Sequence, residues 1–122
     1  TGKHLRCETS QCGACFYDVD GAPGKSCTML AVQVDCSKLV TIEGIVGKDK
    51  LTCLQQTFHH HHALQCGFCT PGMVMTASAL LKRNPDPTED EVRHELEGNI
   101  CRCTGYQNII NAILDAAKIM RG

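Results

Sequence analysis

Ten cysteines in a chain of 122 residues limit the possible folds more than any other feature of the sequence. Two of them, Cys36 and Cys53, stand alone, and the other eight form two sets of four. The sets are Cys7, Cys12, Cys15 and Cys27 in the first half, and Cys66, Cys69, Cys101 and Cys103 in the second. With two Tyr, three Phe and no Trp, each half can bury only a modest apolar core. Small units of this kind commonly need a disulfide or a bound metal for stability.

Charge and hydropathy exclude several classes of partner. The net charge of -1 and the pI near 6.5 give no basic face, so we expect no nucleic-acid partner. No 18-residue apolar run and no signal-like start is present, so we expect a cytoplasmic chain that does not span a membrane. The first residue, Thr1, is not Met, so an upstream segment can be missing or processed. In a reducing compartment, clustered cysteines are more often metal ligands or redox groups than disulfides.

The first cysteine set follows the pattern Cx4CxxC, "CETSQCGAC", with a fourth cysteine further along. This is the plant-type ferredoxin spacing for a [2Fe–2S] cluster. Gly13 inside the loop permits a backbone conformation or close approach that a Cβ would hinder. A structural zinc site and disulfides remain as alternatives, although the extra cysteine before the CxxC pair fits a zinc ribbon poorly.

The second set is a CxxC pair followed much later by a CxC pair, which is not a common zinc-finger spacing. Both pairs precede expected helix starts, at Thr70-Pro71 and at Thr104-Gly105. Helix N-termini carry partial positive charge and free N–H donors. They would stabilise an anionic [2Fe–2S] cluster and raise its reduction potential, which indicates an electron relay. A zinc site again remains open.

The coarse pattern of elements predicts an α+β protein. Strands are expected at 16–21 and 38–44, whereas the apolar run 28–34 suits either a helical turn or a strand. Four helices are predicted, and two of them have no marked cap, at 52–64 and at 106–120. Another starts at N-cap Thr70, with Pro71 at N1, and stops at Asn84-Pro85. The remaining one starts at the capping box of Thr88 and Glu91 and ends at Gly98. A Gly-rich, charged linker at 44–50 divides the chain into domains 1–47 and 48–122.

Taken together, "CETSQCGAC", "QCGFCTPGM" and "GNICRCTGYQNI" resemble the small iron–sulfur subunit of the molybdenum hydroxylase (xanthine oxidase) family, over essentially the whole chain. The resemblance implies a β-grasp, ferredoxin-like domain whose cluster is bound by the first cysteine set. It also implies an antiparallel four-helix domain whose second [2Fe–2S] cluster is bound by the second set. Family members usually begin with a strand hairpin and a helix before the first cysteine. We therefore expect a β-grasp that lacks its first strands.

The same resemblance implies the partners and the route of the electrons. They pass from molybdopterin, as the cytosine dinucleotide, in a large subunit through the two clusters to FAD in a medium subunit. The assembly would be a dimer of heterotrimers, held at the inner face of the membrane through partners. This chain would hold no catalytic residue, and Gln65 and Cys103 would face the pterin. Three further stretches, "GKSCTMLAVQ", "TIEG" and "CTGYQNI", look most like the small subunit of aerobic carbon monoxide dehydrogenase. N-heterocycle hydroxylases, and outside the family a zinc-stabilised interaction module, are the alternatives.

The remaining chemistry-bearing residues have structural interpretations. We expect Cys36 and Cys53 to be free thiols. His59 to His62 are expected to be structural or surface histidines, because adjacent side chains on a helix diverge around its axis. Met29, Met73 and Met75 are expected to fill apolar core. Arg102 suits either an ion pair or a contact with cofactor phosphate.

Overall fold

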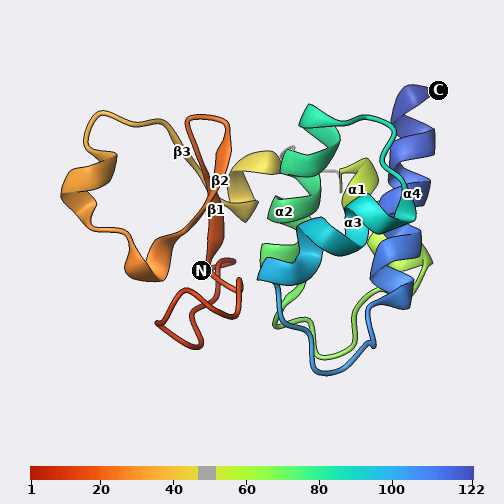
Figure 1. The fold of residues 1–122 in the computed structure, drawn as a ribbon, viewed down its shortest axis with the longest axis horizontal. Coiled ribbons are helices and arrows are strands. Elements are labelled where there is room, and N and C mark those ends of the chain that lie inside the picture. The colour runs from red at the N-terminus through yellow and green to blue at the C-terminus, as the bar shows by residue number, and fades with distance from the viewer. Residues whose placement is uncertain (47–51) are drawn as a thin grey trace.

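The computed structural model describes residues 1–46 and 52–122. A sheet unit and a helical unit stand side by side (Figure 1). The strands are β1 (Phe16–Val19), β2 (Ala22–Lys25) and β3 (Leu39–Val40), and the α-helices are α1 (Cys53–His60), α2 (Thr70–Arg83), α3 (Glu89–Glu95) and α4 (Gln107–Arg121). Short 3-10 turns are η1 (Ser26–Thr28), η2 (Ala31–Val34), η3 (Ile42–Ile45) and η4 (Leu96–Gly98). The mixed α and β class is as expected, and the predicted boundary at 47/48 lies outside the described residues.

The sheet is antiparallel, with strand order β2-β1-β3. The predicted first strand is present but ends at Val19, where a turn through Gly21 leads into β2. The sequence pattern did not mark β2 as a strand because it contains Pro23, which an edge strand tolerates. The strand predicted at 38–44 is too long: β3 has only two residues, and η3 follows it. The run 28–34 forms turns, including η2.

Helices α1 and α3 begin close to their predicted starts, each after a capping threonine. The side chain of Thr52 accepts from the Gln55 N–H and starts α1, which ends at His60, earlier than predicted. The chain turns away there because His62 adopts a left-handed conformation, with φ 51°. The capping box of α3 is confirmed: Thr88 accepts from the Glu91 N–H, and the Glu91 carboxylate accepts from Thr88.

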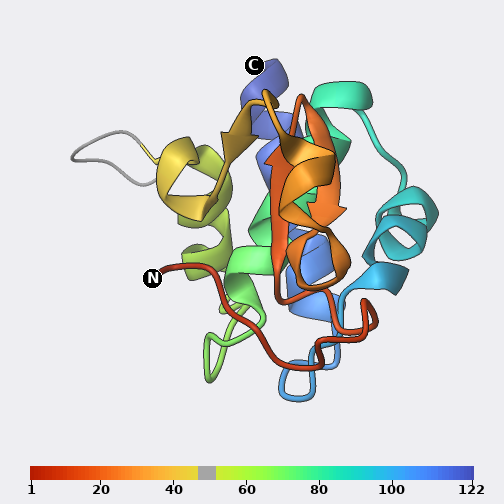
Figure 2. The ribbon, with the colours of Figure 1, turned by 90° about the vertical axis from the view of Figure 1, so that its left-hand side faces the viewer.

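The main core lies among the helices, where Phe58, Met73, Ile109 and Ile113 are almost completely buried. Met73 and Met75 are buried, as expected, whereas Met29 is only half-buried and its sulfur accepts from the Tyr17 hydroxyl. The sheet packs on this core mainly through β1 against α2, and Figure 2 shows the strands in front of the helices. No helix in the described ranges is long and apolar enough to cross a bilayer.

Candidate metal centres

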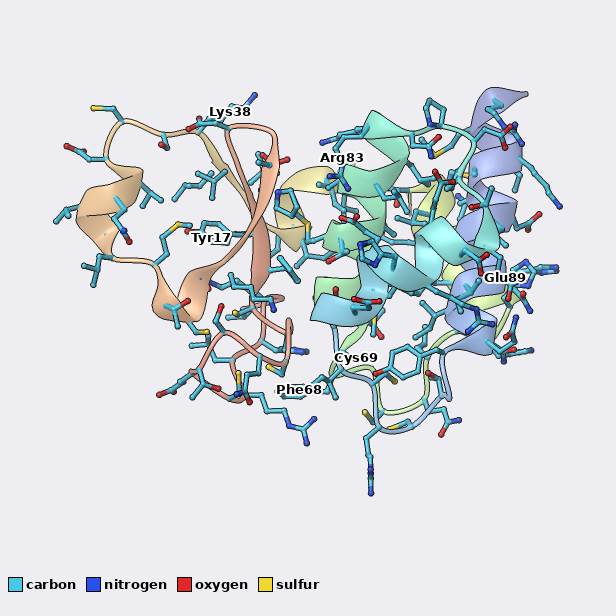
Figure 3. The ribbon with its side chains drawn as sticks, in the orientation of Figure 1. Tyr17, Lys38, Phe68, Cys69, Arg83 and Glu89 are labelled. Carbon is cyan, nitrogen blue, oxygen red and sulfur yellow. The ribbon has the colours of Figure 1, made fainter. Side chains whose placement is uncertain are left out.

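The loops that carry the cysteines lie at one end of the molecule. The loop before β1, the connection from α1 to α2 and the connection from η4 to α4 all lie at the lower end of both views (Figures 1 and 2). Phe68 and Cys69 lie at this end, where the sheet unit meets the helical unit (Figure 3). Two cysteine sets that are far apart in sequence are therefore neighbours in space.

The first loop curls around the thiol of Cys7. The backbone N–H groups of Thr9 and Cys12 both donate to Cys7 Sγ, each over 3.4 Å. Glu8, Ser10 and Gly13 take positive φ values of 54°, 62° and 71°, which bend the loop tightly. Hydrogen bonds from the Thr9 side chain, and then from the Cys12 and Thr9 backbones, lower the pKa of Cys7 to about 5. The loop therefore favours a thiolate, the form in which cysteine binds metal.

The other thiols of the first set lie deeper. Cys12 and Cys15 are buried, and Cys27 lies within side-chain hydrogen-bonding reach of Cys15 at the end of the β1–β2 hairpin. Burial raises the pKa of Cys27. Lys25, at the end of β2, ties the hairpin to the cysteine loop, because its Nζ donates to the Ser10 carbonyl over 2.7 Å. The structure thus brings all four cysteines of the first set to one loop and hairpin.

The second set forms two contacting pairs. The sulfurs of Cys66 and Cys103 lie 3.5 Å apart at the exposed end. Cys69 and Cys101 form the inner pair, in which burial and then the Cys101 side chain raise the pKa of Cys69 to about 12. The pKa of Cys66 is lowered, first by the Phe68 N–H and then by the Cys103 side chain.

One of the two predicted helix starts is confirmed. Helix α2 begins directly behind Cys69, although Cys69 is the N-cap and Thr70 the first helical residue, one position earlier than predicted. The prediction of a helix start at Thr104-Gly105 was wrong. Gly105 and Tyr106 both adopt left-handed conformations, with φ near 70°, so α4 begins only at Gln107.

Thr104 has a different role from the predicted one. Its hydroxyl donates to Cys101 Sγ over 3.1 Å. Burial raises the pKa of Cys101, but the hydrogen bonds from Thr104 and the Cys103 backbone outweigh it and lower the pKa. Thr104 therefore acts on a ligand candidate through its side chain.

Two sets of contacts join the cysteine loops to each other. The Ile100 N–H donates to the Cys12 carbonyl over 2.8 Å, directly before Cys101. Beside it, the buried Asn99 side chain donates to the Gly13 carbonyl over 3.3 Å. Further out, the His4 ring stacks on Phe68 with centroids 4.6 Å apart, and His4 Nδ1 lies 2.7 Å from the Phe68 carbonyl oxygen.

Sequence reasoning missed Asn99, Tyr106 and His4. Tyr106 accepts from the Cys101 N–H over 2.9 Å, and its hydroxyl reaches the Asn99 carbonyl at 3.3 Å. Asn99 and Tyr106 lie within the "GNICRCTGY" motif, so their closeness to the CxC pair was the available signal. The partners of Asn99 and His4 lie far away in sequence, and no local pattern points to them.

The remaining candidates lie near the surface or in separate contacts. Gln65, like Cys103, is exposed beside the second set, and Arg102 is exposed between its two cysteines. His61 pairs with Asp115 over 2.9 Å, and this structural pairing agrees with the expectation for the histidine run. All ten cysteines lie in the described ranges, and there they form no disulfide.

The donor set suits [2Fe–2S] clusters. Each iron of such a cluster takes two of the four protein ligands, and the second set presents its sulfurs as two pairs. Across residues 1–46 and 52–122, no three His, Cys, Asp or Glu side chains are placed to hold a single ion. Next to Cys69, Thr70 Oγ1 is buried without a hydrogen-bond partner among the described residues, and a sulfur acceptor would satisfy it.

Comparison with known proteins agrees with this chemistry. Residues 41–114 match the family model "[2Fe-2S] binding domain". The small subunit of nicotine 6-hydroxylase from Paenarthrobacter nicotinovorans is 52% identical over 95% of this chain and 70% of its own length. Caffeine dehydrogenase subunit gamma from Pseudomonas sp. strain CBB1 is 49% identical over 93% of this chain and 70% of its own.

Solved structures include the same fold. Quinoline 2-oxidoreductase from Pseudomonas putida 86 superposes with a TM-score of 0.95 and 50% identity, over 99% of this chain and 76% of that one. Fold, cysteine arrangement and family model together define a [2Fe–2S]-binding protein. More closely, the chain belongs to the small iron–sulfur subunits of the molybdenum hydroxylase family.

Proposed function

We propose that this chain is a non-catalytic electron relay within a molybdenum-containing oxidoreductase. The first cysteine set would hold one [2Fe–2S] cluster and the second set another, so each cluster would take up and release single electrons. The observation that carries the proposal is the hydrogen bond from Ile100 to the Cys12 carbonyl. Ile100 directly precedes Cys101, and Cys12 is itself a candidate ligand of the other cluster. The hydrogen bond therefore provides a short, fixed route for electrons between the two sites.

The chain's own groups would set the electrostatics of both sites. Hydrogen bonds to sulfur and exclusion of water tune the potential of an iron–sulfur cluster. Cys12, Cys15 and Cys101 are buried, and the Thr9, Cys12 and Thr104 groups donate to sulfur. The N-terminus of α2 adds a positive dipole end behind Cys69. The hydrogen bonds and the helix dipole would favour the reduced, more negative state of a bound cluster, whereas burial of Cys12, Cys15 and Cys101 would oppose it.

The exposed end of the second set is the proposed entry for electrons. Gln65, Cys66 and Cys103 are exposed there, which suits contact with a molybdopterin cytosine dinucleotide held by a large subunit. Electrons would leave through the first set toward FAD in a medium subunit. The assembly proposed is a cytoplasmic dimer of heterotrimers, associated with the inner face of the membrane through its partners.

The proposed substrate of the whole enzyme is a nitrogen heterocycle. The relatives named above are nicotine, caffeine and quinoline enzymes, and all three compounds are N-heterocycles. This favours the heterocycle alternative over carbon monoxide, which local stretches of the sequence had suggested. The substrate would bind in the large subunit, so its identity is tested on the purified complex with each compound.

The proposed layout assigns one cluster to each unit. Residues 1–47 would be a ferredoxin-like unit of the β-grasp type, and residues 48–122 a four-helix unit. The sheet and the helical core described above support this division, since each cysteine set lies on the loops of its own unit.

Metal analysis of the purified complex tests the relay. Two clusters predict about four iron and about four sulfide per copy of this chain, with two distinct paramagnetic signals on partial reduction. Replacement of Cys101 by Ser should remove one signal, whereas the matched variant Cys36→Ser, at an exposed thiol outside both sets, should keep both. Zinc without sulfide would contradict the proposal and favour a zinc-stabilised module.

A further inference from the structure

The segment before the CxC pair lies directly against the first cysteine loop. A Cβ on Gly13 would overlap the Gly98 carbonyl oxygen and stand 2.8 Å from Asn99 Nδ2. A Cβ on Gly72 would overlap the Gly13 carbonyl oxygen from the side of α2. The backbone of Gly13 is therefore enclosed by two other segments, whose backbones approach it directly.

Asn99 is the polar residue at the centre of this contact. It is 3% exposed, and both ends of its amide are used. Nδ2 donates to the Gly13 carbonyl over 3.3 Å, and Oδ1 accepts from the hydroxyl of Thr76, itself buried in α2, over 3.0 Å. A buried amide with both ends bonded holds a fixed orientation, because any rotation leaves a buried polar group unpaired.

The main chain around Asn99 is fixed as well. Its N–H donates to the Leu96 carbonyl over 2.9 Å, and its own carbonyl accepts from the Tyr106 hydroxyl. The next N–H, that of Ile100, donates to Cys12, and the one after it, that of Cys101, donates to Tyr106. Asn99 is thus anchored to α2, to η4, to Tyr106 and to the first cysteine loop.

We propose that Asn99 is a positioning residue for electron transfer between the two clusters, an inference that rests on the proposed function. In that step one electron would pass from a cluster held by the second cysteine set, which would be oxidised, to a cluster held by the first set, which would be reduced. No bond is made or broken, and no proton moves. Asn99 does not carry the electron. Its amide holds the Gly13 carbonyl, which keeps the adjacent Cys12 carbonyl on the Ile100 N–H and so fixes the separation of the two ligand loops.

Truncation of Asn99 should loosen this contact specifically. Without the amide, the buried Gly13 carbonyl keeps only the Phe16 N–H as a donor, over 3.3 Å, and the buried Thr76 hydroxyl loses its Asn99 acceptor. The segment 98–101 would then shift to let water or other donors reach these groups. Such a shift lengthens the route through the Ile100 to Cys12 hydrogen bond while leaving all eight cysteines in place.

The test uses the purified complex with three single variants of this chain. Asn99→Ala removes the amide, and Thr76→Val removes only the hydroxyl that anchors the amide oxygen, at nearly constant shape. Asn111→Ala is the control, at an exposed asparagine on α4 whose Oδ1 accepts from Gln107 Nε2 over 3.2 Å. Electron transfer between the clusters is followed by rapid-freeze paramagnetic resonance after a pulse of reductant. The spin–spin splitting of the fully reduced complex reports the separation of the clusters.

We expect Asn99→Ala to slow transfer by about tenfold or more, the scale seen for residues behind metal ligands, and to change the splitting. Thr76→Val should shift both in the same direction by less, and Asn111→Ala should change neither. Unchanged rate and splitting in Asn99→Ala and Thr76→Val would overturn the inference. If Asn99→Ala does not assemble, Thr76→Val decides alone. A single signal in the unsubstituted complex would overturn the proposed function itself.

Discussion

At the residue scale, Gly13 combines a left-handed backbone with a close approach to the Gly98 carbonyl and to Asn99. Its φ of 71° costs an alanine about 1–2 kcal/mol, and overlap with Gly98 backbone adds about 1–3 kcal/mol. Gly13→Ala should therefore lower the thermal unfolding midpoint strongly and reduce bound iron. Gly21→Ala is the matched control, because Gly21 also has positive φ but nothing within 4 Å of its Cβ position. Equal losses in the two variants would contradict this explanation.

His62 illustrates the same conformational cost at an exposed position. It follows the end of α1 with φ 51°, where glycine is the usual residue. We expect His62→Gly to stabilise the chain by about 1 kcal/mol, because the left-handed conformation no longer strains a side chain. His60→Gly, within the last turn of α1, should instead destabilise it by about 0.5–1 kcal/mol. Chemical denaturation of the two variants measures both effects, and stabilisation by His60→Gly would contradict the argument.

At the scale of elements, the start of α3 depends on a titrating cap. Hydrogen bonds from the Thr88 backbone and then its hydroxyl lower the pKa of Glu91 below its ordinary 4.5. The carboxylate therefore adds stability that is complete above the unfolded pKa and is lost as the pH falls through the lowered, folded pKa. Amide exchange in α3 should accelerate only below about pH 4.5. Glu91→Gln should remove this pH dependence, and an unchanged profile in that variant would contradict the role of the carboxylate.

Elements with local signals were predictable, and elements set by distant contacts were not. The capping box of Thr88 and Glu91, and Pro71 after Cys69, located the starts of α3 and α2 within a residue. Helix α3 nevertheless ends at Glu95, and the 3-10 turn η4 occupies the rest of the predicted span to Gly98. Helix α4, predicted at 106–120, is also displaced by only one residue, but the start signal assigned to Thr104-Gly105 was wrong because Gly105 and Tyr106 adopt left-handed conformations. Strand β2 escaped notice because its pairing with β1 outweighs the poor strand preference of Pro23 and Gly24.

In the candidate site, too, the ligands were predictable from local sequence and the contacts between the loops were not. Cysteine spacing predicted the two sets, and the structure places each set together. The residues that join the sets were not predictable, because Asn99 meets Gly13 across most of the chain length. Spacing along the sequence reports ligands, whereas contacts between loops depend on how the two units pack.

At the scale of the whole molecule, the cysteine loops and the helical core differ in what stabilises them. Cys7, Cys66 and Cys103 lie on loops at or near the surface, while Met73, Ile109 and Ile113 are fully buried among helices. Removal of iron by a chelator should therefore expose the amides of the cysteine loops to exchange and leave α2 and α4 protected. Hydrogen exchange read by mass spectrometry measures this. Uniform loss of protection along the chain would contradict it.

The close approach of Gly13 to Gly72 and Asn99 also limits how related proteins can be recombined. A hybrid that takes its sheet unit from one relative and its helices from another places backbones of different ancestry in contact at this point. Residues 12–14, 72–76 and 98–101 would have to be inherited together. The smallest block that can be exchanged between relatives is therefore this three-part junction, which neither half of the chain contains alone.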